Sequence, residues 1–151
     1  MKNYFFILFA AGAIQSVVFG GRQTIPLSIE GINLASTVNY LEISFAFAVG
    51  QLISGAVTPL GGVISDKYGS GKTLLLGIVI STLGCFLIPF STTPLMLVLS
   101  IGILSAGGSG IAGLPVIMSA VNKLMPPEKS GMAFGFVNAG GSVGQFLFAP
   151  L

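Results

Sequence analysis

Long apolar segments, broken only by short polar connections, set the strongest limit on how this chain can fold. They cover about residues 4–27, 40–64, 74–90, 95–121 and 131–151. Each is near or above the roughly 20 residues that a helix needs to cross a bilayer. Charged residues make up only 7% of the chain, against about 25% in soluble domains. The sequence therefore predicts an all-α, polytopic membrane helix bundle, with residues 1–151 as a single transmembrane domain and the lipid bilayer as its partner.

The lysines occupy alternate connections. They precede the first segment, follow the second, or follow the fourth: Lys2, Lys67, Lys72, Lys123 and Lys129. The other two connections, 28–39 and 91–94, carry no basic residue. Because basic loops stay on the cytoplasmic side of a membrane, we expect a cytoplasmic N-terminus. We expect a multi-pass integral protein of the plasma (inner) membrane.

The first apolar segment has a competing interpretation as a secretory signal. Lys2 precedes it, and Ala11-Gly12-Ala13 fits an Ala-x-Ala cleavage site. The apolar run continues to Phe19, however, which is long for a signal. A membrane span is therefore the favoured interpretation.

Several function classes are disfavoured by the residue types present. Gly71-Lys72-Thr73 matches the end of a phosphate-binding loop, but Asp66 stands where that motif needs a glycine. Gly108-x-Gly110-x-x-Gly113 lacks the strand and the acidic residue of a dinucleotide fingerprint. Without histidine, and with Cys85 as the single cysteine, the chain offers no cysteine–histidine metal site. We expect no enzyme activity, no cofactor, no metal and no nucleic-acid partner.

The connection after the second segment also fits a family pattern. It resembles the loop between helices two and three of major facilitator superfamily transporters, Gly-x-Leu-Ala-Asp-Arg/Lys-x-Gly-Arg/Lys-Arg/Lys. Ile64 replaces the leucine, Ser70 and Gly71 replace the basic pair, and Lys72 restores one charge. The resemblance implies a conformational-switch loop formed by Gly62, Asp66, Lys67, Gly69 and Lys72. Independently of the family, Gly62 and Gly69 permit close packing and a sharp turn, and Asp66 can pair with either lysine or with a helix end.

A second connection supports the same resemblance. Pro126-Pro127-Glu128-Lys129-Ser130-Gly131, followed by Gly135, resembles the fourth-to-fifth helix junction of the superfamily. The resemblance covers the whole chain and implies a solute transporter whose two six-helix halves alternate access to a central site. Five segments are one short of a half, so we expect an incomplete chain. Its partners would be the missing C-terminal helices of the same transporter and a small-molecule solute.

The first segment suggests a subfamily. Arg22, Pro26 and Glu30 resemble the basic residue and following extended segment of monocarboxylate transporters and oxalate–formate antiporters. The resemblance implies a small organic solute, with a carboxylate as the favoured class. Two common features of drug–proton antiporters are absent, namely an arginine in the fourth helix and a Gly-Pro pair in the fifth. A drug–proton antiporter and a non-transporting remnant or regulatory subunit remain alternatives.

Polar residues inside the apolar segments are the candidate substrate ligands: Arg22, Gln15, Asn138 and Gln145. A charge at the bilayer centre costs roughly 2.5–3.5 kcal/mol, so such charges tend to be functional. Arg22 lies roughly 27 Å along its helix from Tyr4, where it could instead snorkel to the headgroups. Each amide could equally bond a neighbouring helix.

Small residues recur at helical spacing. Gly50 with Ser54, Gly131 with Gly135, and Gly140 with Gly144 form small-xxx-small pairs, which predict close helix packing in lipid. Glu42 is expected to be a solvated carboxylate in the first turn of the second segment, where the helix dipole favours it.

Overall fold

The computed structural model describes residues 2–35 and 38–148, and no strand occurs among them. The four long helices are α1 (Lys2–Thr24), α3 (Tyr40–Tyr68), α4 (Ser70–Leu87) and α8 (Ser130–Phe148). The fourth apolar segment comprises α5 (Pro94–Leu97), the π-helix η3 (Val98–Ser105), α6 (Ala106–Ile111) and α7 (Leu114–Leu124). Short connecting helices are η1 (Ile25–Ser28), α2 (Ile29–Ala35), η2 (Ile88–Phe90) and η4 (Pro127–Lys129).

Four helical stretches in the described residues are long and apolar enough to cross a membrane. They are residues 4–23, 40–68, 70–90 and 94–124. The fifth expected segment corresponds to α8, which falls outside this set because Asn138, Gln145 and several glycines lower its hydropathy. The all-α, polytopic membrane bundle is confirmed.

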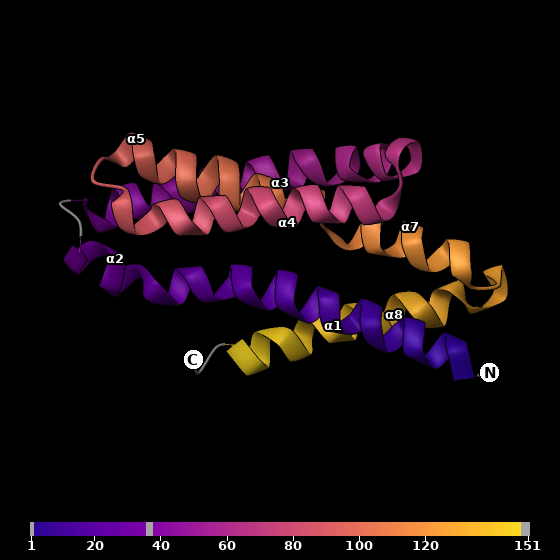
Figure 1. The fold of residues 1–151 in the computed structure, drawn as a ribbon. Helices are drawn as coiled ribbons and strands as arrows, with labels where there is room; N and C mark the ends of the chain where they lie inside the picture. The colour runs from indigo at the N-terminus through magenta and orange to yellow at the C-terminus, as the bar shows by residue number, and fades with distance from the viewer. Residues whose placement is uncertain (1, 36–37, 149–151) are drawn as a thin grey trace.

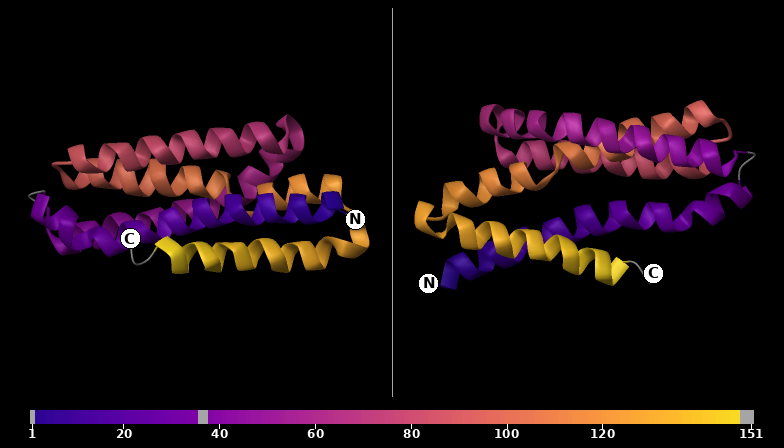
Figure 2. Two further views of the ribbon diagram at one scale, coloured as in Figure 1. Left: turned by 60° about the horizontal axis from the view of Figure 1, so that its bottom comes forward. Right: turned by 180° about the vertical axis from the view of Figure 1, so that it is seen from behind.

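The helices form two packed groups. One group contains α3, α4 and the α5–α6 stretch, and the other is the α1–α8 pair (Figure 1). Helix α7 contacts helices of both groups and joins them at one end. Seen from behind, α1 and α8 cross each other alongside the other group (Figure 2). In this arrangement, the side of α1 that faces the other helix group lies opposite α3, α4 and α6.

Glycines let the helices of each group approach closely. A Cβ built on Gly140 of α8 would lie 2.6 Å from the carbonyl oxygen of Gly12 in α1, and one on Gly61 of α3 would lie 2.7 Å from that of Ile111. A Cβ on Gly131 or Gly135 would meet no heavy atom within 4 Å. None of the described helices packs on the Gly131–Gly135 face of α8, so close packing at this pair stays a prediction.

The fourth apolar segment is not the single continuous helix that its composition suggests. It changes from π-helix to α-helix and breaks at residues 112–113 before α7 begins. Pro115 lies in the first turn of α7, where its missing N–H costs no helical hydrogen bond. The break places the start of α7 in the middle of the bundle. The polar connection 28–39 likewise contains α2, which was not expected.

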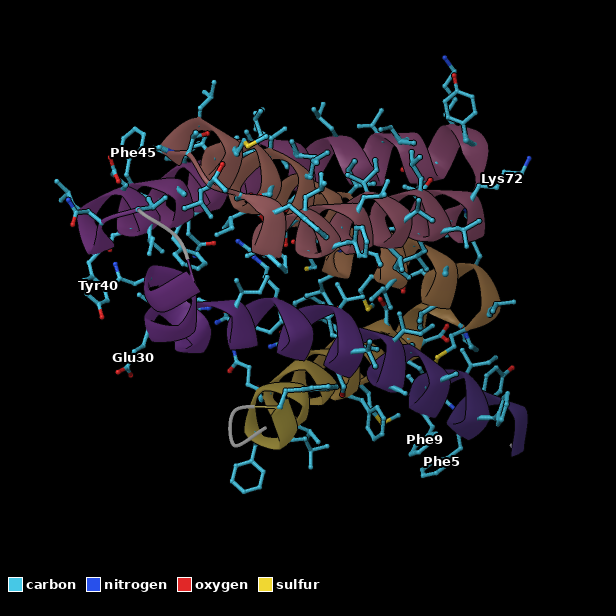
Figure 3. All side chains as sticks on the ribbon, turned by 60° about the vertical axis from the view of Figure 1, so that its left-hand side comes forward. Phe5, Phe9, Glu30, Tyr40, Phe45 and Lys72 are labelled. Carbon is cyan, nitrogen blue, oxygen red and sulfur yellow. The ribbon has the colours of Figure 1, made fainter. Side chains whose placement is uncertain are left out.

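The lysine-bearing connections gather at one end of the bundle. Figure 1 shows the N-terminus, the α3–α4 turn and the α7–α8 turn at the same end. The ammonium of Lys129 lies 5.3 Å from the ring centroid of Tyr4. Figure 3 shows Glu30 and Tyr40 at the end opposite Lys72. The common end agrees with the alternation of charge in the sequence, and its assignment to the cytoplasm remains a prediction.

Large apolar side chains cover the outer surface. Phe5 and Phe9 of α1 are 68% and 63% exposed, and both point away from the bundle (Figure 3). Exposed aromatic and aliphatic groups on this scale suit contact with lipid rather than water. The chain is an integral, multi-pass membrane protein.

Candidate functional site

Arg22 lies in the last turn of α1 and reaches across to α3. Its Nη1 donates to Ser54 Oγ over 2.9 Å, and its Nη2 donates to Gln51 Oε1. Both partners are neutral, and no carboxylate of the described residues forms an ion pair with the guanidinium. The half-buried positive charge is therefore held between α1 and α3 by hydrogen bonds that orient it without neutralising it.

Three cavities meet at this side chain. A cavity of about 490 Å³ separates α1 from α4, one of about 270 Å³ lies beside α3, and one of about 190 Å³ lies between α1, α3, α6 and α8. Arg22 lines all three. A guanidinium at such a junction can contact a solute that enters from more than one direction. This arrangement suits a site at which a solute binds and is then released.

The cavity of about 190 Å³ brings together three of the four candidate ligands from the sequence. Gln15 and Arg22 of α1 and Asn138 of α8 all line it. Phe19 lines it as well, in agreement with the helical spacing that places it on the same face of α1 as Gln15 and Arg22. Gln145 is half-buried on α8 but is not among the residues that line this cavity.

Gln15 is the most deeply buried of the candidates. Its side chain is 5% exposed, and its Oε1 has no hydrogen-bond partner among the described residues. Its amide nitrogen lies towards α8, since a Cβ built on Gly141 would be 3.5 Å from Nε2. A buried amide oxygen without a hydrogen-bond partner destabilises the folded state by about 1–3 kcal/mol.

Residues of α3 and α6 complete the cavity, and sequence reasoning did not select them as ligands. They are Ser54, Thr58 and Ser109. A single Ser or Thr in an apolar segment is weak evidence for a ligand, because its hydroxyl commonly bonds the backbone carbonyl one helical turn earlier. Gln51, the other partner of Arg22, was equally missed. Only the tertiary structure shows that Ser54 and Gln51 bond the arginine and that Thr58 and Ser109 line the same cavity.

The expected switch loop forms the turn between α3 and α4. Gly69 adopts φ of 95° there, a conformation that other residues rarely adopt. Asp66 does not pair with Lys67 or Lys72 in the described structure; it accepts a hydrogen bond from Ser119 of α7 at 3.0 Å. The lysines are exposed, with the ammonium of Lys67 5.5 Å from the Tyr68 ring centroid.

Gly62 and Glu42 occupy opposite parts of α3. Gly62 lies near Pro115, since a Cβ built on it would be 3.8 Å from the proline Cβ. Glu42 Oε2 accepts from the N–H of Asn39, 2.9 Å away. This is a first-turn capping contact, as expected for that carboxylate.

Comparison with known protein families shows to which family this chain belongs. The family described as Major Facilitator Superfamily matches residues 4–151. The chain belongs to the Major Facilitator Superfamily. The resemblance stated from the two connecting loops is thereby confirmed.

Three curated relatives cover most of the chain. Monocarboxylate transporter 13 of Rattus norvegicus is 26% identical over 91% of this chain and 32% of its own length. The oxalate:formate antiporter of Oxalobacter formigenes is 27% identical over 100% of this chain and 35% of its own length. A vacuolar membrane amino acid uptake transporter, fnx2, of Schizosaccharomyces pombe is 28% identical over 74% of this chain and 19% of its own length. The chain thus spans about a third or less of these relatives, all of which are named as transporters or antiporters.

Proposed function

We propose that this chain forms part of a secondary transporter that moves a small organic anion, with Arg22 as the cationic anchor for a carboxylate. The transporter works by alternating access in the plasma (inner) membrane, together with further helices of the same protein. The similarity to relatives named as a monocarboxylate transporter and an oxalate:formate antiporter supports this solute class.

The main support for the proposal is that the Arg22 charge has no counter-charge among the described residues. In a medium of low dielectric constant, a charged group needs a counter-charge or a dense set of hydrogen bonds. Ser54 and Gln51 each accept one N–H from the guanidinium, and within residues 2–35 and 38–148 we find no acceptor for its other N–H groups, which can therefore bind a ligand. A carboxylate can accept two parallel bonds from such a planar fork. An anionic solute therefore completes the site both electrically and geometrically.

The proposal includes further helices because the chain accounts for 32% and 35% of the length of the two carboxylate-related relatives. In alternating-access folds the solute site lies between structural repeats. We expect the chain expressed alone to show no saturable uptake in proteoliposomes. Saturable, solute-specific uptake by the chain alone would show that it does not need further repeats.

Substitution of Arg22 in the complete transporter tests the anchor. Arg22→Lys keeps the charge but loses the planar fork, so the apparent affinity for carboxylates should fall. Arg22→Gln should nearly abolish anion transport. Loss of a charge-assisted bond of about 1.5–3 kcal/mol corresponds to roughly ten- to hundred-fold in affinity. Lys123→Gln removes an exposed charge at the end of α7 and should leave the affinity unchanged.

The measurement is the apparent affinity for several carboxylates in proteoliposomes, with protein amount determined for each variant. Wild-type affinity in both Arg22 variants would show that the arginine only anchors α1 at the membrane interface. A complete transporter that moves no carboxylate, or protein that inserts but moves no solute of any class, would favour the antiporter or remnant alternatives.

A further inference from the structure

The two hydrogen-bond partners of Arg22 differ in how firmly they are held. Ser54, which accepts from Nη1 over 2.9 Å, is only 5% exposed. Its backbone packs closely on α6, since a Cβ built on Gly110 would lie 3.0 Å from the Ser54 carbonyl oxygen. Gln51, which accepts from Nη2, is exposed. A long, exposed side chain can change rotamer far more easily than a short, buried one, so Gln51 is the partner that can move away.

The same two partners line different cavities. Gln51 and Arg22 both line the cavity of about 270 Å³ beside α3. Ser54 lines the cavity of about 190 Å³ instead, and Gln51 is not among the residues that line that one. A solute that reaches the arginine through the cavity beside α3 therefore contacts Gln51 as well, whereas the bond to Ser54 belongs to the wall of the other cavity.

The bond to Gln51 occupies part of the guanidinium that a carboxylate uses. A planar guanidinium presents parallel N–H groups along two of its edges, and Nη2 contributes one N–H to each of these edges. The bond from Nη2 to Gln51 therefore takes one N–H of one edge. A carboxylate that accepts both parallel bonds on that edge has to displace the glutamine amide.

The amide of Gln51 is a neutral acceptor, and a solute carboxylate is a charged one. Hydrogen bonds between two ionised groups are roughly twice as strong as neutral ones, so a carboxylate can replace the amide, and the amide can return when the solute leaves. We propose that Gln51 is an exchangeable internal ligand: its amide oxygen positions Arg22 while the site is empty, and a solute carboxylate takes its place at Nη2. This inference rests on the proposed function of Arg22.

Two substitutions of Gln51 should change the affinity for carboxylates in opposite directions. Gln51→Met keeps the side-chain length and removes the acceptor, so an entering carboxylate displaces nothing and should bind about ten-fold more tightly. Gln51→Glu places an internal carboxylate on Arg22. It is ionised at neutral pH, because the ordinary pKa of glutamate is about 4.3 and a neighbouring cation lowers it. Solute affinity should then fall by about ten-fold or more. A purely structural role of Gln51 would lower the affinity in both variants.

The measurement is the apparent dissociation constant of acetate, propanoate and oxalate at neutral pH, obtained from ligand-dependent thermal shift of the purified complete transporter. Asn122→Asp makes the same amide-to-carboxylate change at an exposed residue near the end of α7, where its oxygen can still accept from Ser130. This control should keep the wild-type affinity. In an Arg22→Gln background, Gln51→Met should no longer raise the affinity, because the amide then has no guanidinium to release.

The outcomes separate this inference from the proposed function. If Arg22→Gln weakens binding but Gln51→Met fails to raise the affinity, or Gln51→Glu fails to lower it, the exchange role of Gln51 is overturned and the anchor stands. A wild type that binds none of the acids, or an Arg22→Gln variant that binds them as the wild type does, overturns both. Should Gln51→Met fail to fold, Gln51→Leu replaces it in the same assay, and the same rise in affinity is required.

Discussion

Ser119 Oγ donates a hydrogen bond to Asp66 Oδ1 over 3.0 Å, which ties α7 to the end of α3. Ser70 at the start of α4 lies 3.4 Å from the same serine, and Ser65 donates to Ser70 at 2.9 Å. The one acidic residue of the α3–α4 connection is therefore held by a serine of the helix that begins beside the Arg22 cavity.

Asp66 is the first residue to test in this connection. Asp66→Asn keeps an oxygen that can accept from Ser119 but removes the charge. We expect the charge to stabilise one conformation of the loop, and we therefore expect slower transport by the complete protein with a near-normal amount in the membrane. The initial rate in proteoliposomes, normalised to protein, measures this. Ser119→Ala should slow transport in the same direction, whereas an unchanged rate in the asparagine variant would make the charge dispensable.

Gly140 tests the contact between α1 and α8. Gly140→Ala would place a methyl group 2.6 Å from the backbone oxygen of Gly12, so the helices must separate. Overpacking of this kind costs about 1–3 kcal/mol, and we expect a lower midpoint of thermal unfolding in detergent. Gly135→Ala on the same helix meets no atom within 4 Å and serves as the control. Equal midpoints for the two variants would mean that α8 does not pack closely on α1.

Gly69 tests the turn between α3 and α4. Its φ of 95° is available to glycine at little cost, whereas alanine there should be strained by roughly 1–3 kcal/mol. We expect Gly69→Ala to lower the unfolding midpoint. Gly71, two residues later, is helical and exposed, and a Cβ there meets nothing within 4 Å. Gly71→Ala should therefore raise the midpoint, since alanine favours a helix by about 1 kcal/mol.

Membrane orientation can be tested with single cysteines after Cys85→Ser. Ser70 is only 7% exposed, so Lys72 is the better reporter of the α3–α4 connection. Lys72→Cys and Lys129→Cys should resist impermeant thiol reagents in intact cells, whereas Gly31→Cys at the exposed opposite end should react. All three should react in permeabilised cells. External labelling at Lys72→Cys would reverse the topology expected from the lysines.

The sequence determined those features that depend on composition along the chain. Apolar runs of helical length leave a membrane bundle as the solution, because backbone groups in lipid must bond within their own helix. The distribution of lysines indicated which connections share an end, and the loop residues around Asp66 and Gly69 identified the family. The helical spacing of Gln15, Phe19 and Arg22 was enough to place them on one face.

Only the tertiary structure decided which faces meet. In the structure, Arg22 bonds Gln51 and Ser54 of α3. Asn138 lines a cavity together with Arg22, whereas Gln145 does not. It showed that Gly140 packs against α1 while Gly135 does not, although both belong to small-xxx-small pairs. It also showed that the fourth apolar segment is interrupted at residues 112–113. Helical periodicity fixes the faces of each helix by itself, but the contact between two faces depends on the shape and hydrogen bonding of both, which residues far apart in the chain supply jointly.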